Sequence, residues 1–191
     1  MTEEFPEFSL GKIKLRKFFP DDVDAVFKGL SDPLVIAHYD VSYSSLGATD
    51  EQMRWFDQIF SEKSGIWWAI ADRQNNSVVG ACGFNAWSRL HRSVDLGYWL
   101  MPEHWRQGIL SEALPTIIRY AFREMGIHRL HADVDTENLA SCALLRKLGF
   151  HLDGTQRDVE YKEGKFVSVH QYSLLASDGS ASELLSDCQL R

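Results

Sequence analysis

The segment GYWLMPEHWRQGILSEAL, residues 97–114, decides the fold that we expect for this chain. It starts within the alternating run SVDLGYWLM, which is typical of a β-strand, and it ends in the first turns of an amphipathic helix. The loop between them contains Pro102, Trp105, Arg106 and Gly108. A strand that passes through a tight loop into a helix leaves unpaired N–H groups at the helix N-terminus, where phosphate can bind. The segment therefore predicts a strand–loop–helix unit with a phosphate site.

The helix after this loop has apolar residues at a period of about 3.6 residues. Pro115 lies inside the pattern and cannot donate a hydrogen bond to the carbonyl of Ser111, so we expect a kink or a later helix start. The segment HRLHADVD, residues 128–135, then reads as a strand. Two strands joined by a helix in this way form a right-handed crossover unit. The apolar positions of the helix are Leu110, Leu114, Ile117, Ile118, Ala121, Phe122 and Met125.

The remaining segments predict a mixture of strands, helices and hairpins. Thr49 is expected to cap the second helix, with Gln52 at the capping-box position, and Gly149 is expected to close the last helix of the domain. The other expected elements are a strand at 11–19, a helix at 20–30 that ends at Asp32-Pro33, an irregular stretch at 35–48, a hairpin at 66–87, a helix at 137–149 and a hairpin at 151–175 around the turn 162–164.

This order of elements predicts an α/β (α+β) fold with a mixed sheet. We expect a twisted and mostly antiparallel sheet of about seven strands, flanked by about four helices, with one parallel strand–helix–strand unit at the phosphate site. Residues 1–176 are expected to form a single domain, and residues 177–191 a polar tail with Leu184 and Leu185 in one weak helical turn.

Composition limits the function. The 191 residues suit one domain with a sizeable core, and 20 Lys+Arg against 27 Asp+Glu give a formal charge of −7. This charge disfavours a nucleic-acid partner and favours a cationic one. The three cysteines form no CxxC pair, the histidines do not cluster, and the N-terminus does not resemble a signal peptide. We therefore expect a cytoplasmic protein without a metal site or a membrane-spanning segment.

Two further motifs accompany the loop. Residues 97–114 together with ENLASCALLRKLGF, residues 137–150, resemble the acetyl-CoA-binding core of the GNAT superfamily of N-acetyltransferases, and within it the branch of ribosomal-protein N-terminal acetyltransferases. The family loop has Arg or Gln, two residues, Gly, one residue, and Gly or Ala, and Gly108 is the position here that keeps the strict pattern. Asn138 and Ser141 match more closely, and the final hairpin is similar to that of the branch. The resemblance covers residues 10–175 and implies the GNAT fold and acetyl-CoA as the acetyl donor.

The free amides at the start of the helix can bind the diphosphate of coenzyme A without any side chain. Gly108 lets the backbone come close, and Arg106 either places a guanidinium beside the diphosphate or faces water. Asn138 either bonds the pantetheine amides or caps its helix, and both roles are compatible. The residues expected to bind the cofactor are Leu100, Met101, Arg106, Gln107, Gly108, Ile109, Leu110, Ser111, Asn138 and Lys147.

Acetyl transfer to an amine needs a neutral amine, a site for the tetrahedral oxyanion and a proton for the departing thiolate. The resemblance implies that a backbone N–H near Leu100 and Met101 binds the oxyanion. Ser141 is the expected proton donor, with Tyr98 and Tyr161 as alternatives, although a helical serine can also bond its own backbone. The resemblance implies an acidic residue close to the acceptor at the position of Glu160, which is therefore the expected general base, acting directly or through water. The other nearby carboxylate, Glu112, is expected to serve the helix dipole instead.

The acceptor groove is expected between the irregular stretch around His38, Tyr39 and Tyr43, the strand end FNAW and the last hairpin. Tyr39 and Asn85 are the expected acceptor contacts. With reference pKa values of about 7.8 and about 10.4, roughly a tenth of α-amines but well under a thousandth of lysine amines are neutral at pH 7. An α-amine therefore demands less of the base, and we expect a protein N-terminus, that of a ribosomal protein, as the acceptor.

Several alternatives stay open at this stage. A polyamine or aminoglycoside acceptor is compatible with the acidic balance, and the few glycines of the loop are compatible with a non-catalytic acyl-CoA-binding module. The exposed sheet edge expected at the final hairpin favours a homodimer. Trp105 is expected either in the core or as a lid over the cofactor, with the core favoured, and the residues expected in the core include Trp67, Trp68, Trp87 and Trp99.

Overall fold

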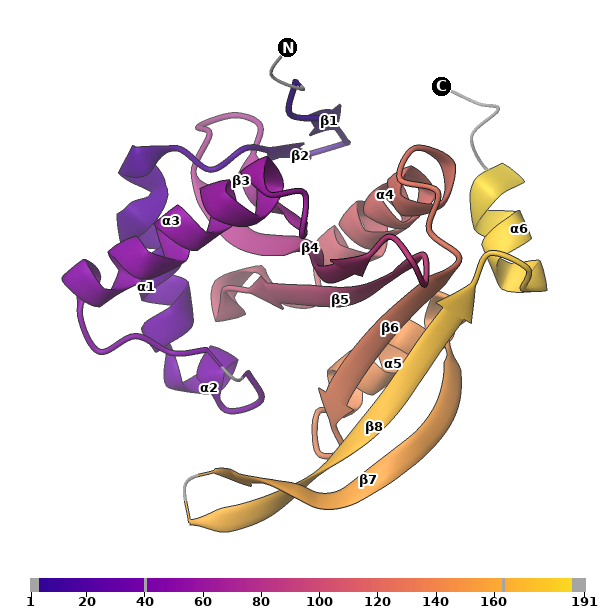
Figure 1. Cartoon of the computed structure of the whole chain (residues 1–191). Coiled ribbons are helices and arrows are strands. Elements are labelled where there is room, and N and C mark those ends of the chain that lie inside the picture. The colour runs from indigo at the N-terminus through magenta and orange to yellow at the C-terminus, as the bar shows by residue number, and fades with distance from the viewer. Residues whose placement is uncertain (1–3, 40, 163, 187–191) are drawn as a thin grey trace.

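A computed structural model describes residues 4–39, 41–162 and 164–186 of the chain. Its centre is a single sheet of eight strands in the order β1-β2-β3-β4-β5-β6-β8-β7 (Figure 1). Only the β5–β6 pair is parallel, and every other neighbouring pair is antiparallel. The predicted mixed, mostly antiparallel fold is therefore confirmed, with the two-residue β1 as an added strand. The strands are β1 Phe8–Ser9, β2 Ile13–Arg16, β3 Ile66–Asp72, β4 Val78–Ser88, β5 Ser93–Leu100, β6 Arg129–Asp135, β7 His151–Lys162 and β8 Lys165–Leu175.

Helices cover both faces of the sheet. The main core packs α4 and α5 against one face, where Leu114 and Leu145 are fully buried, and a second core packs α1 and α3 against the other, where Val26 and Phe56 are buried. Alternate residues of each strand therefore face different helices. The described α-helices are α1 Val23–Ser31, α2 Pro33–Ile36, α3 Leu46–Ser61, α4 Ile109–Arg123, α5 Leu139–Lys147 and α6 Gly179–Ser186, of which α2 was not predicted and α6 was expected only as one weak turn.

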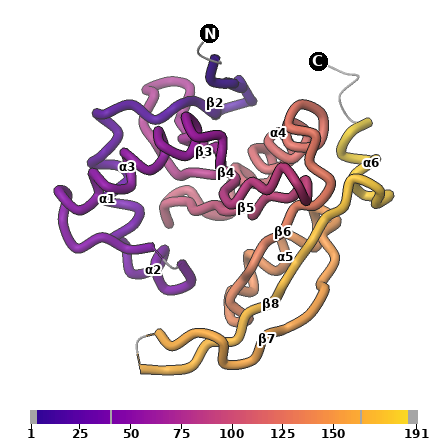
Figure 2. Tube along the Cα trace, in the orientation of Figure 1, coloured from indigo at the N-terminus to yellow at the C-terminus, as the bar shows by residue number. Residues whose placement is uncertain are grey.

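The parallel strands β5 and β6 separate along their length. Their ladder consists of three pairs, Ser93 with Arg129, Val94 with Leu130 and Asp95 with His131, in the part of the chain that the structure describes. Beyond this point β5 stays paired with β4 as far as Leu100, and β6 stays paired with β8 as far as Asp135. Figures 1 and 2 show the two strands running apart from the end of their ladder. The sheet is thus split by a gap between the C-terminal halves of β5 and β6, which the sequence pattern did not reveal.

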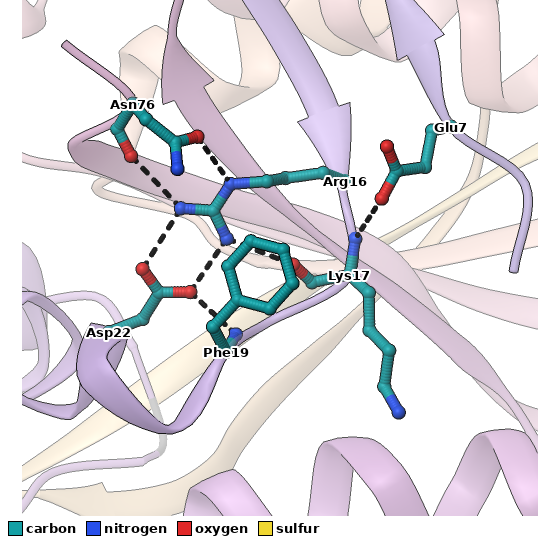
Figure 3. Close-up of polar contacts among 6 residues, drawn as sticks. All are labelled: Glu7, Arg16, Lys17, Phe19, Asp22 and Asn76. Atoms are coloured by element: carbon teal, nitrogen blue, oxygen red, sulfur yellow. Dashed lines mark hydrogen bonds and ion pairs between the residues drawn. The ribbon is translucent and has the colours of Figure 1, made fainter.

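A buried ion pair fixes the start of α1 to the sheet (Figure 3). The Arg16 side chain, on β2, is 1% exposed, and its Nη1 and Nη2 atoms donate to the Asp22 carboxylate at 2.7 and 2.9 Å. Its Nε and Nη2 also donate to Oδ1 and the backbone oxygen of Asn76, at 2.8 and 3.0 Å. The Phe19 ring lies 4.5 Å from the guanidinium, and Phe19 N–H donates to Asp22 Oδ2 at 2.7 Å. Because the buried charges are paired and well bonded, the cluster holds α1 against the turn before β4.

Helix α3 begins earlier than predicted. Its N-cap is Ser45, whose Oγ accepts a hydrogen bond from the Ala48 N–H at 3.3 Å. Thr49, the predicted cap, is fully buried inside the helix, and its Oγ1 donates to the Ser45 carbonyl at 3.1 Å. Ser and Thr are both good caps, so burial of Thr49 decided the boundary. The predicted stop at Asp32-Pro33 is present, but Asp32 also caps the short helix α2 through the Leu34 N–H at 2.8 Å.

The helix that follows the loop runs from Ile109 to Arg123 with Pro115 inside it, so the later helix start is wrong. Pro115 lacks the N–H that would bond the Ser111 carbonyl, but Ser111 is exposed and water can take that place.

The tryptophan predictions are confirmed for Trp67, Trp68 and Trp99, which are buried, whereas Trp87 is only partly buried. Trp105 is 43% exposed, so the favoured core placement of this residue is wrong.

The segment after residue 176 contains a longer helix than the one weak turn expected at Leu184 and Leu185. In α6, Ala181 is fully buried in the main core and Ser180 Oγ donates to the Gly149 carbonyl at 3.1 Å. Arg123 of α4 also donates to the Leu185 carbonyl. Because these contacts join α6 to α4 and to the end of α5, the helix packs on the body of the protein. Residues 187–191, which include Cys188, lie outside the described part of the chain.

Candidate active site

The edge of β5 that faces the gap carries backbone groups that the sheet does not use. The Met101 N–H donates to the Val79 carbonyl on β4 at 2.9 Å, so it belongs to the ladder. Successive residues of a strand point their N–H and C=O groups to opposite sides, so those of Tyr98 and Leu100 point away from β4 and toward β6. The Leu100 carbonyl accepts a hydrogen bond from Trp105 Nε1 at 2.7 Å. The gap is therefore lined by the N–H groups of Tyr98 and Leu100, and Trp105 folds back along the strand end.

The loop after β5 ends in the left-handed residue Gly108, with φ +79° and ψ 1°, immediately before α4. The first bond of this helix runs from the Glu112 N–H to the Gly108 carbonyl at 3.1 Å, so the N–H groups of Ile109, Leu110 and Ser111 have no partner within the helix. A Cβ built on Gly108 would have no described heavy atom within 4 Å. The space beside this backbone is open, and a ligand can approach it closely.

The two polar residues before Gly108 differ in their surroundings. Gln107 Nε2 donates to the Glu103 carbonyl at 2.8 Å, so this side chain stabilises the loop. Arg106 is exposed and has φ +60°. An exposed guanidinium at this point adds positive charge next to the helix N-terminus, where an anion is already favoured. Lys147, at the C-terminal end of α5, is also exposed.

A pair of hydroxyl groups connects β5 with α5. Tyr98 lies on the face of β5 that packs against the main core, and its OH is 2.6 Å from Ser141 Oγ. Asn138 caps α5 and accepts the Ser141 N–H through Oδ1 at 3.1 Å, so its predicted capping role is present. Burial raises the pKa of Tyr98 to about 12, although the hydrogen bond with Ser141 acts in the opposite direction. The phenol therefore stays protonated at neutral pH.

On the opposite face, the end of β6 borders a hollow that contains the predicted base, Glu160. His38 Nδ1 and Asp135 Oδ2 are 2.6 Å apart, and Lys162 Nζ donates to the backbone carbonyls of Ile36 and Tyr39 at 2.7 and 2.6 Å. These contacts tie the segment after α2 to β6 and to the β7–β8 hairpin. The hollow is lined by His38, Asp133, Asp135, Glu160, Lys162, Val167 and Val169.

The carboxylates at this end of the sheet respond differently to their surroundings. Burial raises the pKa of Asp135, but hydrogen bonds from the Glu137 N–H and from His38 outweigh it, and the pKa lies below its usual value. Burial also raises the pKa of Asp95; His131 lowers it and Asp133 raises it, and the net result is a raised pKa. Carboxylates therefore line part of the hollow and lie at the point where β5 and β6 separate, and they favour a positively charged ligand there.

The structure brings some of the predicted residues together and separates others. Asn85 of β4 lies directly opposite Asp95 of β5, and Asp95 lies opposite His131 of β6. These three residues therefore share one face of the sheet at the start of the gap. Tyr161, an alternative proton donor, packs on Phe166 of the hairpin with 5.0 Å between ring centroids and is 67% exposed. Ser141 is instead in contact with Tyr98, the other alternative donor.

Sequence reasoning missed a row of polar residues on β6. His131, Asp133 and Asp135 alternate with buried residues in HADVD and therefore lie on one face, where His131 Nε2 is 2.9 Å from Asp133 Oδ1. The alternation was visible in the sequence, but it carried no indication that β6 would separate from β5 at this point.

The Glu112 carboxylate lies close to Gly11, so it is directed toward the turn between β1 and β2.

Comparison with known proteins identifies the family. The family described as acetyltransferase (GNAT) domain matches residues 12–151. This chain belongs to the GNAT acetyltransferase family. An uncharacterised N-acetyltransferase, YoaA of Bacillus subtilis, is 33% identical over 172 residues, which is 90% of this chain and 97% of the relative.

Solved GNAT structures share the fold. RimL, a ribosomal α-N-protein acetyltransferase in complex with coenzyme A, superposes with a TM-score of 0.78 at 24% identity, covering 86% of this chain and 94% of that one. The spermidine N-acetyltransferase of Vibrio cholerae, in complex with coenzyme A and spermine, also superposes with a TM-score of 0.78, at 18% identity. The match covers 87% of this chain and 96% of the Vibrio chain.

As a GNAT acetyltransferase, the protein takes its acetyl group from acetyl-CoA. The residues present fit this cofactor, because a Cβ on Gly108 would meet no described heavy atom within 4 Å and the N–H groups at the start of α4 have no partner within the helix. Within the described ranges, no group of three or more His, Cys, Asp or Glu side chains is arranged to hold a metal ion. The same part of the chain contains no helix with the length and apolar character required to cross a membrane.

Proposed function

We propose that this enzyme acetylates the α-amine at the N-terminus of a protein, that of a ribosomal protein in the cytoplasm. The observation that carries the proposal is the hollow at the end of β6, where Asp133, Asp135 and Glu160 lie together on the side opposite α4 and α5. A cationic amine is attracted to this site, whereas the cofactor path lies along the other face. The fold shared with RimL, which acts on protein α-amines, supports the same choice.

Glu160 is the proposed general base. Asp133 and Asp135, beside it, concentrate negative charge that attracts the protonated amine, and Glu160 then accepts its proton directly or through water. An α-amine has a pKa of about 7.8 and a lysine amine one of about 10.4. A carboxylate base therefore removes a proton more readily from the α-amine. The proposed contacts for the acceptor chain are Tyr39, in the segment that the His38 and Lys162 contacts hold in place, and Asn85, on β4 opposite Asp95.

The cofactor residues have separate proposed tasks. Acetyl-CoA supplies the acetyl group as a thioester. The N–H groups of Ile109, Leu110 and Ser111 hold its diphosphate with Arg106 adding charge, and Gly108 leaves room for the approach. The Leu100 N–H, on the side of β5 away from β4, is the proposed donor to the oxyanion, because the Met101 N–H is held by the Val79 carbonyl. The remaining predicted cofactor residues are Gln107, which stabilises the loop, Asn138 and Lys147.

Ser141 is the proposed donor of a proton to the departing thiolate, and water replaces that proton. Its place in the first turn of α5, beside the gap and bonded to Tyr98, supports this role. The amine loses its proton to Glu160 on the opposite face. The proposed reaction therefore moves one proton on each side of the sheet and forms no covalent intermediate with the protein.

A small polyamine is the second candidate acceptor. The same three carboxylates suit a ligand with several positive charges, and the V. cholerae spermidine acetyltransferase has the same fold. The third alternative, a module that binds acyl-CoA without turnover, is disfavoured by membership of a family of enzymes.

The test is a competition assay with acetyl-CoA and an equimolar mixture of four acceptors, with each product resolved by mass. The acceptors are a peptide with the N-terminus of a ribosomal protein, the same peptide with a blocked N-terminus and a free lysine, spermidine, and an aminoglycoside. We expect acetylation of the free N-terminus above all. Spermidine as the main product would replace the protein acceptor with the polyamine, and the absence of any product would support the binding module.

The proposed partner in the assembly is a second copy of the chain. Strand β7 lies at the edge of the sheet and its twelve residues are mostly exposed, which leaves a row of backbone groups for pairing. Sedimentation of the full chain at micromolar concentration tests this, with a dimer as the expected species and a monomer as the contrary result.

A further inference from the structure

The contact between Tyr98 and Ser141 joins two elements across the gap. Tyr98 lies three residues beyond Asp95, the last β5 residue that pairs with β6, and Ser141 lies in the first turn of α5. The two hydroxyl oxygens are 2.6 Å apart although the residues are separated by 43 positions. This distance is typical of a short O–H···O hydrogen bond, so the serine hydroxyl has a defined partner at the point where the strands separate.

Two separate bonds fix Ser141. The Asn138 side chain holds its backbone N–H at 3.1 Å, and Tyr98 holds its side chain. A helical serine without such a partner turns its hydroxyl to a carbonyl of the preceding turn. The bond to Tyr98 instead fixes the Ser141 oxygen beside the phenol.

Either oxygen can donate in this pair, and both hydroxyl groups keep their protons at neutral pH. The phenol is buried, and the titratable groups beside it are Cys142 on the same turn of α5 and Tyr172 on β8. None of these groups removes the phenol proton, because burial raises the pKa of Tyr98 to about 12. If Tyr98 donates to Ser141 Oγ, the serine hydrogen is free to point elsewhere, and donation into its oxygen makes it a stronger donor.

We propose that Tyr98 is a positioning residue, whose hydroxyl donates to Ser141 Oγ and thereby directs the Ser141 hydrogen toward the departing sulfur of coenzyme A. Tyr98 keeps its own proton and acts only through Ser141. This inference rests on the proposed role of Ser141 as proton donor. It assigns Tyr98 a supporting role, not that of an alternative donor.

The test compares the Tyr98→Phe, Ser141→Ala and double variants of the full chain. Tyr98→Phe keeps the buried ring and removes the hydroxyl, so we expect kcat to fall by about threefold to tenfold while KM for acetyl-CoA stays within about twofold. Ser141→Ala should lower kcat by about a hundredfold or more. In the double variant, kcat should equal that of Ser141→Ala, because Tyr98 has no further target.

Tyr172→Phe is the matched control. The Tyr172 hydroxyl is also buried and has no hydrogen-bond partner among the described residues, so its removal should leave kcat unchanged. Unaltered kcat in Tyr98→Phe, or a further tenfold loss when it is added to Ser141→Ala, would overturn the role of Tyr98 alone. Full activity of Ser141→Ala would instead overturn the proposed role of Ser141, and with it this inference.

Discussion

The two sides of the gap between β5 and β6 are built in different ways. The cofactor side consists of β5, the loop, the start of α4 and the start of α5, all between residues 93 and 141, and the hydrogen bond between Tyr98 and Ser141 within it spans 43 positions. The acceptor side is held by contacts between residues 97 and 126 positions apart, from His38 to Asp135 and from Ile36 to Lys162. Local motifs therefore describe the cofactor side well, whereas the acceptor side exists only after distant segments have come together.

The difference also concerns the chemical groups. On the cofactor side, backbone N–H groups at β5 and α4 offer positive dipole ends to a diphosphate and an oxyanion. On the acceptor side, the carboxylates of Asp133, Asp135 and Glu160 offer negative charge to an amine. A substitution on one side should therefore change the affinity for one substrate and leave the other unaffected.

The largest expected effect that separates the two sides comes from Gly108→Val. Gly108 has φ +79°, a conformation that costs a β-branched residue about 1–3 kcal/mol, and the added isopropyl group fills the open space beside the loop. Displacement of the neighbouring N–H groups should weaken acetyl-CoA binding by about a hundredfold or more. Titration calorimetry measures this directly.

Gly126→Val is a matched control for this prediction. Gly126 also has a left-handed φ, +65°, and open space around it, but it lies beyond the other end of α4. The same backbone strain should lower Tm in both variants, and only Gly108→Val should lose affinity. Equal loss of affinity in both, or near-normal affinity in Gly108→Val, would contradict the assignment of the loop.

On the acceptor side, Glu160→Gln should change kcat and leave the affinity for acetyl-CoA unaltered. Loss of the general base should lower kcat by about a hundredfold to ten-thousandfold, with the dissociation constant of acetyl-CoA unchanged. Glu137→Gln is the control, because Glu137 is an exposed carboxylate that pairs with Lys165 at 2.7 Å and does not line the hollow. Steady-state kinetics with the preferred amine separate the two, and similar kcat values for both variants would count against Glu160 as base.

The smallest effect is expected for Asp153→Asn, on the pH dependence of stability. Asp153 forms the ion pair with Arg129 that joins β6 to the hairpin carrying Glu160. The hydrogen bond from Arg129, at 2.7 Å, lowers the pKa of Asp153 to about 2. A lowered carboxylate pKa stabilises the folded state above the unfolded pKa of about 3.9, and this contribution is lost as pH falls toward 2. Denaturant unfolding between pH 5 and pH 2 should therefore show a slightly weaker acid dependence for Asp153→Asn, whereas an unchanged slope would show that the pair adds nothing.

The sequence predicted the elements whose signals are local. The strand before the loop, the helix with its period from Leu110 onward, the capping of α5 by Asn138 and the final hairpin are all present. The errors lie where local signals were equivalent and burial decided between them. Ser45 and Thr49 are both good caps, and only the burial of Thr49 inside the helix shows that Ser45 begins α3. Trp105 resembles a core residue by type, yet its indole N–H is used to bond the Leu100 carbonyl at the surface.

The sequence by itself determined the membership of the GNAT family, the order of strands and helices, and a loop whose glycine precedes a helix N-terminus, because each depends on neighbours within one or two turns of chain. Only the tertiary structure decided that β5 and β6 separate after Asp95, that Tyr98 meets Ser141, and that Glu160 lies beside Asp133 and Asp135. The separation exists because each strand keeps its outer partner, β4 or β8, while the sheet bends away between them. Pairing of this kind depends on contacts between distant segments, and no periodicity within a single segment encodes it.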